Sequence, residues 1–310
     1  MDTRYCLHPT ISSSGEYFPC GKCPVCRMKY RKQMAVRLYM EKSIEKPIYS
    51  YFITLTYNEQ NIPTYSGRLC FSKKHLQIFL DSVRHRLRSS GLKLRYFATC
   101  EYGEEGYRPH YHLIMFLYGN NHLFKGRYSF LHEVVEPLWN KGFCYQDSVS
   151  LASIMYCTSY ALKDDEALER DWTGFERGRP FRLFSLRPGL GLTDNCQAWW
   201  TDYVFNDGDF RSGIHIGLPK RSVNACIPVG IKRILKDNYP DQYNLLKECN
   251  DTARKESLSS LADNFRKYGG IEYRNGKPNI DFFDSTPDKE ITAFRKAVRE
   301  LAKRQRKPLK

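Results

Sequence analysis

The sequence predicts an α+β fold in which helices flank a mainly antiparallel central sheet, and three features of the chain support this prediction. Segments rich in β-branched and aromatic residues recur along it, as expected of strands. Between them, apolar residues recur at the three- and four-residue spacing of amphipathic helices. The hydrophobic fraction of 41% and the aromatic fraction of 14%, in a chain of 310 residues, provide enough apolar surface for a packed core.

Helices and strands alternate through the first half of the chain. A helix predicted over 27–45 is ended by Pro47, which lacks a backbone donor. The strand predicted over 110–118 has apolar residues on both alternating faces, which predicts a central strand covered on both sides. The other predicted elements are strands over 49–57, 94–102 and 143–149 and helices over 71–87, 131–140 and 154–167.

Beyond these elements the patterns weaken. A glycine-proline turn is predicted over 184–191, and a short strand leading into a turn over 213–221. We divide the chain on this basis into a cysteine-rich segment with a basic helix (1–46), a core domain (47–168) and an accessory region with a basic tail (169–310).

The charge of the chain favours a polyanionic partner. The formal net charge is +15 and the pI is near 9.3, and lysine and arginine set against phosphates release condensed counterions. Anionic membranes attract the same surface, but neither a lipidation signal nor a basic amphipathic anchor is visible. No apolar run approaches the roughly 18 residues that span a bilayer, and the first residues lack the layout of a signal peptide. We therefore expect a soluble, intracellular protein that binds nucleic acid.

The C-terminal segment 292–310 is predicted to form a basic helix or tail. It is either a solvated extension or a non-specific contact to the DNA backbone, and its composition favours neither. Its basic residues include Arg295, Lys296, Arg299, Lys303, Arg304, Arg306 and Lys307.

Two histidines, His110 and His112, stand two residues apart in a predicted strand, so their side chains leave the same face. A His-x-His pair alone is equally compatible with an ordinary strand. Glu101 ends the preceding predicted strand, and a hairpin would place it beside the histidines; Glu104 and Glu105 in the connecting loop are rival third ligands. Two imidazoles and one carboxylate suit an Mg²⁺ or Mn²⁺ ion that holds a phosphate oxygen. The sequence therefore predicts a divalent-metal site at this face.

Tyr156 and Tyr160 are four residues apart on a predicted helix, and Lys163 is three further, so the three share one face. An aromatic stripe that packs into the core would show the same spacing. A phenol of reference pKa about 10 is a weak nucleophile at neutral pH, and a nearby cation or base favours its phenolate. A metal on the scissile phosphate would stabilise the developing charge. These residues therefore predict tyrosine attack on a DNA strand.

Such an attack would give a 5′-phosphotyrosine and a free 3′-hydroxyl. Because the covalent intermediate keeps the energy of the phosphoester, the strand could later be rejoined without a nucleotide cofactor. In keeping with that, the sequence contains no GxxxxGK[ST] phosphate loop.

Three segments, taken in order, resemble a known family. FITLTY (52–57), CEYGEEGYRPHYHLIMF (100–116) and YCTSYALK (156–163) look like the three motifs of HUH replication initiators, in particular those of gokushovirus-type microviruses (Microviridae). The resemblance extends to CGKCPVC (20–26) and SLRPGLG (185–191). It implies a rolling-circle replication initiator that nicks single-stranded DNA at an origin and later rejoins it.

The resemblance also implies roles for individual residues. It implies that His110 and His112 bind the metal, that Tyr156 and Tyr160 are a pair of nucleophiles, and that Lys163 assists at the scissile phosphate. A pair of nucleophiles would let the enzyme stay attached through one tyrosine while the other cuts the regenerated origin.

The fold implied by the resemblance is the HUH endonuclease fold, with a five-stranded antiparallel sheet and helices on it. The predicted strands account for four of the five, so one is unplaced. The segment 54–57 is expected to lie beneath the active site, with a structural and DNA-positioning role. The implied partners are single-stranded DNA and the replication origin, together with a helicase and a polymerase of the host, in the cytoplasm of a bacterial cell.

Eleven cysteines form an odd set, and without an export signal a disulfide framework is not expected. Cys20, Cys23 and Cys26 follow a C-x₂-C-x₂-C spacing and could form a structural Zn²⁺ site with Cys6, or with His8, as the fourth ligand. Three ligands of an iron–sulfur cluster would show the same spacing, and a metal-free segment is a further alternative. The other cysteines are expected to be buried packing residues: Cys70, Cys100, Cys144, Cys157, Cys196, Cys226 and Cys249.

Two other functions fit part of the sequence. Plasmid relaxases and single-strand transposases also use a His-x-His site, but relaxases place their tyrosine before the histidines and transposases usually carry one, whereas here a pair follows them. A non-catalytic module for single-stranded nucleic acid would use the strand aromatics and the charge. That alternative leaves the combination of histidines, glutamate, tyrosines and lysine unexplained.

Overall fold

The computed structural model describes most of the chain up to residue 248 and two short pieces beyond it. The described residues are 10–11, 13, 17–21, 24–65, 67–103, 106–163, 180–206, 214–216, 223–225, 227–248, 273–274 and 277–278. The chain forms two compact units, a larger one of residues 31–206 and 214–231 and a smaller one of residues 1–30, 207–213 and 232–310. The boundaries predicted at 46/47 and 168/169 concern independent folding, which this grouping does not test, and they stay predictions.

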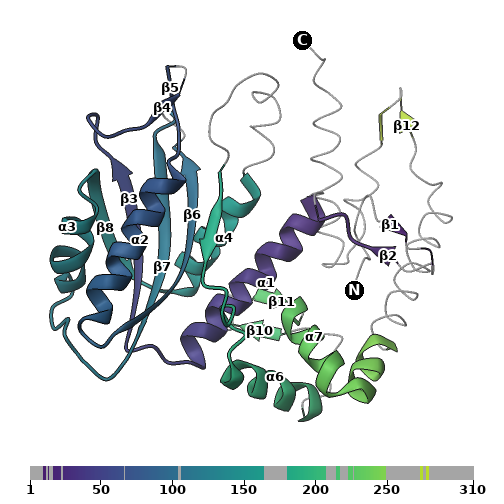
Figure 1. The fold of residues 1–310 in the computed structure, drawn as a ribbon. Coiled ribbons are helices and arrows are strands. Elements are labelled where there is room, and N and C mark those ends of the chain that lie inside the picture. Colours follow the sequence, from purple (N-terminus) through teal and green to yellow (C-terminus); the bar gives the residue numbers. More distant parts are fainter. Residues whose placement is uncertain are drawn as a thin grey trace. The chain divides into compact units, whose positions relative to one another are not determined.

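The larger unit is built on a five-stranded antiparallel sheet with the strand order β8–β3–β7–β6–β9 (Figure 1). The central strand β7 is buried from Tyr111 to Leu117, which confirms that both of its faces are covered. In chain order the strands are β3 (Tyr49–Tyr57), β6 (Lys93–Tyr102), β7 (Pro109–Tyr118), β8 (Gly142–Ser148) and β9 (Arg182–Phe184).

Helices and short hairpins connect and cover these strands. A π-helical turn η1 (Leu131–Val135) leads directly into α3 (Glu136–Leu138). The remaining helices are α1 (Pro24–Ser43), α2 (Lys73–Arg88), α4 (Leu151–Lys163), α6 (Asp194–Asn206) and α7 (Val229–Asn238). Two small hairpins pair β4 (Thr64–Tyr65) with β5 (Arg68–Leu69) and β10 (Ile214–Ile216) with β11 (Val223–Ala225).

One face of the sheet carries the apolar core. Helix α2 begins at the cap residue Ser72, whose Oγ accepts a hydrogen bond of 3.1 Å from the backbone N–H of His75. Its apolar residues recur at helical spacing, so one side of α2 packs on the sheet together with η1. The core residues on this face include Ile53, Leu55, Leu76, Phe79, Leu80, Val83, Leu94, Leu113, Met115, Val134 and Trp139.

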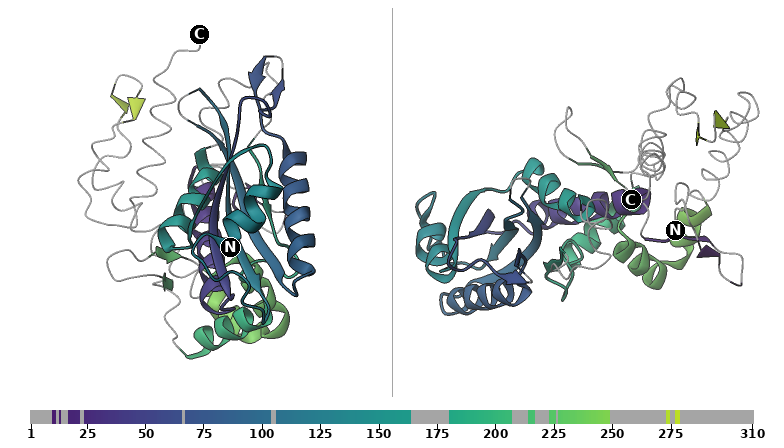
Figure 2. Two further views of the ribbon diagram at one scale, coloured as in Figure 1. Left: turned by 90° about the vertical axis from the view of Figure 1, so that its left-hand side faces the viewer. Right: turned by 90° about the horizontal axis from the view of Figure 1, so that it is seen from above.

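The opposite face of the sheet is covered by α1 and α4. Figure 2 shows the sheet nearly edge-on in its left view, with α2 on one side and α1 on the other. Helix α4 lies next to β6 and β7. Because side chains alternate along a strand, the residues on this face are those between the core residues, and they include both histidines.

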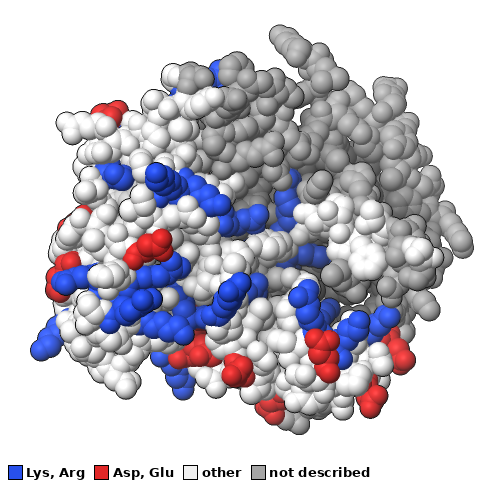
Figure 3. All heavy atoms as spheres, in the orientation of Figure 1, with Lys and Arg blue, Asp and Glu red and all other residues white. Residues whose placement is uncertain are grey.

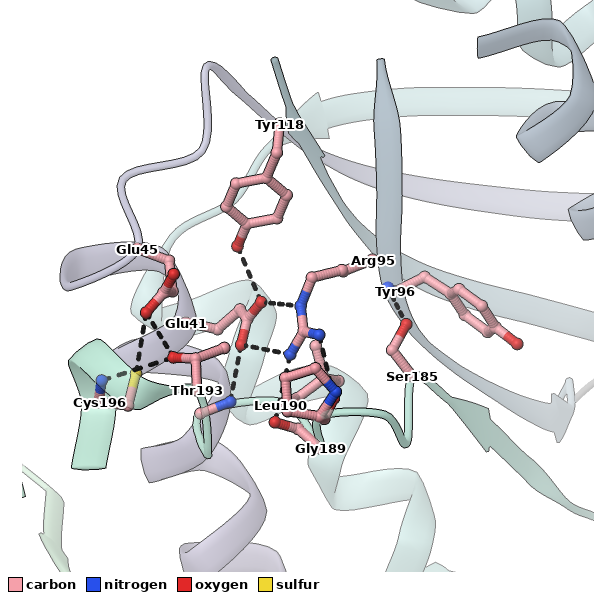
Figure 4. A network of polar contacts seen from close by, with 12 residues as sticks. Glu41, Glu45, Arg95, Tyr96, Tyr118, Ser185, Gly189, Leu190, Thr193 and Cys196 are labelled. Atoms are coloured by element: carbon pink, nitrogen blue, oxygen red, sulfur yellow. Dashed lines mark hydrogen bonds and ion pairs between the residues drawn. The ribbon is translucent and has the colours of Figure 1, made fainter. Parts of the chain in front are cut away.

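A buried ionic network joins α1, β6 and the segment after β9. The guanidinium of Arg95 binds the carboxylate of Glu41 through two nitrogens, and both side chains are almost completely buried (Figure 4). Glu41 also accepts hydrogen bonds from Tyr118 Oη at 2.8 Å and from the Gly191 N–H at 2.7 Å. Arg95 donates to the carbonyl of Gly189 at 3.2 Å. The buried charges thus have hydrogen-bonding partners, as burial requires.

The glycine of SLRPGLG that ends this segment is required by close packing. Gly191 has φ +63°, and a Cβ there would stand 2.4 Å from the carbonyl oxygen of Arg37 on α1. Any side chain would push the segment off the helix, so the turn predicted over 184–191 docks through a glycine.

The smaller unit contributes fewer described elements. They are the hairpin of β1 (Thr10–Ile11) and β2 (Tyr17–Phe18), the hairpin of β12 (Tyr273–Arg274) and β13 (Lys277–Pro278), and a helical segment at 240–248. The basic segment predicted over 292–310 lies outside the described residues, so its two alternatives stay open.

The predicted fold class is confirmed, and the missing strand is found. Each predicted strand of the core domain appears within two residues of its expected ends, and the fifth strand is β9 (Arg182–Phe184), which pairs with β6 at the sheet edge. It is only three residues long, which explains why alternation in the sequence did not reveal it. The helix predicted over 131–140 is instead a π-helical turn followed by a short helix that contains Pro137.

Two surface properties complete the description. Within the described part of the chain, none of the helices is long and apolar enough to cross a bilayer. Lys and Arg side chains gather on the face that α2 covers (Figure 3), where the exposed basic residues of this helix are Lys73, Lys74, Arg86 and Arg88. This basic surface is on the side of the sheet away from the histidines.

Candidate active site

The two histidines are held by threonines of the neighbouring strand. In the β3–β7 ladder Thr54 is the partner of His112 and Thr56 is the partner of His110. The hydroxyl oxygen of Thr54 lies 3.0 Å from Nδ1 of His112, and that of Thr56 lies 2.9 Å from Nδ1 of His110. Since Nδ1 is engaged in both rings, Nε2 of each is the nitrogen that can face a ligand.

Glu101 lies beside both histidines. It is the cross-strand partner of His110 in the β6–β7 ladder, and its Oε1 stands 3.0 Å from Nε2 of His112. The two imidazole rings are stacked with centroids 6.5 Å apart. The hairpin predicted between the two strands therefore brings these three residues together, whereas the rivals Glu104 and Glu105 lie outside the described residues.

The environment keeps His110 uncharged. Burial lowers the pKa of its imidazole below the ordinary value, the nearby His112 and Arg108 lower it further, and Glu101 opposes them. A neutral imidazole retains the lone pair that binds a metal. The local electrostatics thus suit ligation better than they suit a permanent positive charge.

The donor set suits a divalent cation, although the side chains do not enclose one. Among the described residues, no group of three or more His, Cys, Asp or Glu side chains is arranged as a metal cage. Space is nevertheless kept at the right atom, because a Cβ at Gly103 would stand 3.0 Å from Nε2 of His110. Two imidazole nitrogens and one carboxylate, with an open side, match a cation that must also bind a phosphate oxygen.

One of the two predicted nucleophiles stands against this site. The ring of Tyr156 on α4 meets the ring of His112 edge-on, with centroids 5.1 Å apart, and is 6.1 Å from Phe52. The rings of Phe52 and His112 are stacked, with centroids 5.9 Å apart. Tyr156 is 42% exposed, so its phenol can be reached by a DNA strand. Tyr160 and Lys163 belong to the same helix, but their side chains lie outside the described part.

Local contacts fix α4 in this position. The hydroxyl of Ser150 accepts a hydrogen bond of 3.1 Å from the N–H of Ser153, which caps the start of the helix. Arg31 of α1 donates to the carbonyl of Met155 at 3.3 Å. Ile154 and Cys157 are fully buried, so the helix packs through the side that leaves Tyr156 toward the histidines.

The tyrosines of the opposite face are poor nucleophile candidates. Tyr57 and Tyr111 lie in the core, where their hydroxyl oxygens are 2.9 Å apart. Burial is the main cause that raises the pKa of both phenols. They therefore stay protonated at neutral pH and are enclosed by the core, in contrast to the partly exposed Tyr156.

The predicted cysteine site is described only in part. Sγ of Cys20 lies 3.9 Å from Sγ of Cys26, whereas Cys6, Cys23 and the alternative ligand His8 lie outside the described residues. Of the cysteines expected in the core, Cys100, Cys157 and Cys196 are buried, Cys70 and Cys144 are half-buried, and Cys226 and Cys249 are not described. Burial raises the pKa of Cys144 and of Cys196 to about 12, so these thiols are unreactive.

Sequence reasoning missed several residues that shape the site. It placed 54–57 beneath the site without assigning the threonine–histidine hydrogen bonds, which cross-strand pairing could have revealed. Phe52 and Gly103 were inside quoted motifs but were given no role. The Glu41–Arg95 pair had no visible signal, because the two residues are 54 positions apart and belong to different elements.

Comparison with known proteins identifies related chains from small phages. A family model described as replication-associated protein ORF2/gene II protein matches residues 50–165. The chain is 30% identical over 280 residues to replication-associated protein VP4 of Bdellovibrio phage phiMH2K, a match that covers 84% of this chain and 81% of the relative. No solved structure matches at a significant level.

Two further relatives match a smaller part of the chain. Replication-associated protein ORF2 of Spiroplasma virus 4 is 29% identical over 171 residues, which cover 53% of this chain and 51% of the relative. Replication-associated protein ORF4 of Chlamydia phage 1 is 25% identical over 158 residues, which cover 47% of this chain and 38% of the relative.

Proposed function

Because the chain belongs to the family of phage replication-associated proteins, we propose that it initiates rolling-circle replication by nicking single-stranded DNA at an origin with a tyrosine. The observation that carries this proposal is the position of Tyr156, whose ring lies 5.1 Å from that of His112. His112 contacts Glu101 and lies next to His110 on the same sheet face. A nucleophile and a set of candidate metal ligands are thus close enough to act on one phosphate.

The family relationship agrees with the motifs. The resemblance to microvirus-type replication initiators, inferred from three ordered segments, is confirmed at the level of the family. The family model covers 50–165, which contains every candidate site residue except the N-terminal cysteines. The nicking chemistry itself is our proposal.

In the proposed reaction the phenol oxygen of Tyr156 forms a bond to the scissile phosphorus, and the bond from phosphorus to the 3′ oxygen breaks. The phenol loses its proton and the leaving 3′ oxygen gains one, so the products are a 5′-phosphotyrosine and a 3′-hydroxyl. Attack by a 3′-hydroxyl on the phosphotyrosine reverses these changes and rejoins the strand. The energy of the phosphoester is kept throughout, so no nucleotide cofactor is needed.

The side chains around Tyr156 would orient this reaction. Thr54 and Thr56 fix the two imidazoles by their Nδ1 atoms, and Glu101 faces His112 at 3.0 Å. An Mg²⁺ or Mn²⁺ ion held by the two histidines and the glutamate would stabilise negative charge on the phosphate oxygens. The tyrosine, presented from a separate element, can approach the phosphate from the helix side.

The second tyrosine and the lysine have proposed supporting roles. Tyr160 follows Tyr156 by one turn of α4, a spacing that places both on one side of the helix. It would make the second cut after the strand has been copied, while Lys163 would neutralise charge at the phosphate. A host helicase and polymerase, and action in the host cytoplasm, stay predictions from the resemblance.

The two alternatives are weaker on the same grounds. A relaxase- or transposase-type enzyme shares the histidine pair, but here two tyrosines follow the histidines on one helix. A non-catalytic binding module accounts for the charge and the sheet, but it gives no reason for an exposed tyrosine against a threonine-held histidine.

The test is covalent capture. The purified full chain is incubated with an origin-bearing single-stranded oligonucleotide of the phage genome and Mn²⁺, with and without chelator, and separated on a denaturing gel. We expect a protein–DNA adduct that chelator and His110→Ala both abolish, while the variant still binds the oligonucleotide. Binding without any adduct would instead support the non-catalytic module.

We also propose that Cys20 and Cys26 are two ligands of a structural Zn²⁺ ion. Their sulfur atoms are 3.9 Å apart, close to the roughly 3.8 Å edge of a tetrahedral site with Zn–S bonds of about 2.3 Å. The separation is far longer than a disulfide bond of about 2.05 Å.

Elemental analysis of the purified chain tests the zinc site. We expect one Zn²⁺ per chain, lost in Cys20→Ser and retained in Cys70→Ser, which removes a thiol outside the cluster. Iron with visible absorption would indicate a cluster instead, and a metal-free native chain would exclude both.

A further inference from the structure

Two aromatic side chains on the edge strand β8 are exposed to solvent. Phe143 is 70% and Tyr145 is 57% exposed, whereas Gln146, which points to the other side of the strand, is buried. Single exposed aromatics are common on protein surfaces. Two in alternate positions of one strand are different, because alternate residues share a face and so form a continuous apolar surface.

The strand register places these rings in line with the histidines. Tyr145 is the cross-strand partner of Thr54, and Phe143 is the partner of Thr56. The same two threonines bind the histidine rings from the other side. Side chains of cross-strand partners lie on one face, so each aromatic extends a row that begins at a histidine. With strands about 4.8 Å apart, each ring stands roughly 10 Å from the corresponding histidine along the sheet.

A glycine fixes this register. Gly142, at the start of β8, has φ +158°, and a Cβ there would lie 2.1 Å from the carbonyl oxygen of Thr56. Only glycine allows the two strands to approach so closely at this point. The position of Phe143 directly opposite Thr56 is therefore a built-in feature of the edge strand.

Positive charge is available at the end of the same row. Asp147 continues the series of Phe143 and Tyr145 on β8, and Nη2 of Arg127 lies 3.9 Å from its Oδ1. The Arg127 side chain is 76% exposed, so it can also meet a phosphate. An apolar pair with a neighbouring arginine, on a chain of net charge +15, is complementary to unpaired bases on a phosphate backbone.

We propose that Phe143 and Tyr145 form a stacking surface for unpaired bases of the DNA strand that enters the active site, with Arg127 at a flanking phosphate. This proposal rests on the proposed function, because it assumes that the strand passes the histidines. Successive rings on one side of a strand are about 6.7 Å apart, so each can take a separate base. Duplex DNA, whose bases are already stacked, cannot use the rings in this way.

The test measures DNA affinity separately from cleavage. In a Tyr156→Phe background without metal, fluorescence anisotropy gives the Kd for a labelled oligothymidine. We expect Phe143→Ala with Tyr145→Ala to weaken binding by about twenty-fold or more, at about five-fold for each lost base stack. Phe143→Trp with Tyr145→Phe should bind as the parent does. Ile78→Ala is the matched control, because Ile78 is 51% exposed on α2, on the opposite side of the sheet.

A second probe separates stacking from a change in structure. An oligonucleotide of equal length without bases should bind the parent weakly, and removing the two rings should then make little further difference. Equal affinity of the double alanine variant and Ile78→Ala for oligothymidine would overturn the stacking proposal. A change in oligomeric state with unchanged DNA affinity would overturn it too, and would identify a second copy of the chain as the occupant of this edge.

The two proposals can fail independently. Ring-dependent binding without a covalent adduct in the unmodified chain would overturn the nicking function and retain the base-binding surface. A chelator-sensitive adduct with ring-independent binding would retain the nicking function and overturn the stacking surface.

Discussion

The two faces of the five-stranded sheet are made from the same strands and differ in every property that matters for function. On β7, Tyr111 and Leu113 point into a closed apolar core under α2, while His110 and His112 point to the other face. That second face is itself divided. One part, around Arg95, is sealed by α1, and the other carries the histidines, Tyr156 and the exposed rings of β8.

The difference teaches how a small sheet separates stability from chemistry. Residues of the core face are held by burial, and changing them should mainly alter the free energy of unfolding. The histidines and the residues around them are oriented by single hydrogen bonds at an open site, so changing them should mainly alter activity. The four predictions below test this separation, beginning with the largest expected effect.

Removing both candidate nucleophile hydroxyls should abolish covalent chemistry and leave the fold unchanged. In Tyr156→Phe with Tyr160→Phe only two oxygen atoms are lost, and Tyr156 is partly exposed. We expect the adduct yield to fall at least about a hundred-fold, in keeping with the loss of a nucleophile, with a thermal midpoint within about 2 °C of the parent. Full nicking by this variant would remove both tyrosines from the mechanism.

Breaking the buried ionic pair should do the reverse in the sealed part of the same face. Arg95→Met leaves the Glu41 carboxylate buried without its cation, a change that typically costs about 3–5 kcal/mol. Urea denaturation measures it. The double variant Glu41→Met with Arg95→Met should regain much of the loss, because no isolated charge remains. A single variant as stable as the parent would contradict the structural role of the network.

Removing the threonine hydroxyls should slow the reaction without unfolding the protein. Thr54→Val and Thr56→Val keep the shape of the side chain and free Nδ1 of each histidine. Loss of such a supporting hydrogen bond typically lowers metal affinity or activity by about 10–100-fold. Titration of nicking with Mn²⁺ checks this.

The control is Tyr111→Phe, on the same strand as the histidines but on the core face. It removes a hydroxyl that binds Tyr57, so it should lower stability while nicking stays near the parent rate. Similar effects of the threonine and tyrosine changes on both properties would break the proposed division between the faces.

The smallest effect is expected from pH on the core face. Burial lowers the pKa of His75 below the ordinary value of about 6.5, and Lys141 and Lys74 lower it further. Between the folded and the unfolded pKa, the unfolded chain therefore binds more protons. This contribution to stability is present above about pH 6.5 and is lost as pH falls through the folded pKa.

His75→Gln tests that contribution. Glutamine can still bind the Tyr57 hydroxyl, which lies 3.1 Å from Nδ1 of His75, but it does not titrate. The stability of the variant, measured by urea denaturation between about pH 7 and pH 5, should fall less steeply than that of the parent. Parallel curves would show that His75 does not contribute.

Local patterns were sufficient for most elements of the fold. The strands over 49–57 and 110–118 and the helix over 71–87 are long and strongly patterned, and the structure places them within two residues of their expected ends. The three-residue β9 was missed because its pairing depends on β6, which is 80 or more positions earlier. Such an edge strand is defined by its neighbour rather than by its own sequence.

The sequence by itself determined which residue types stand on which side of each strand, because side-chain alternation is a property of the extended backbone. His110 and His112 had to share a face, and Tyr156 had to lie on a helix after them. Only the tertiary structure decided that Tyr156 meets His112, that threonines hold both rings, and that Phe143 and Tyr145 line up with them. These contacts depend on strand order and register, which are set by packing across the whole sheet.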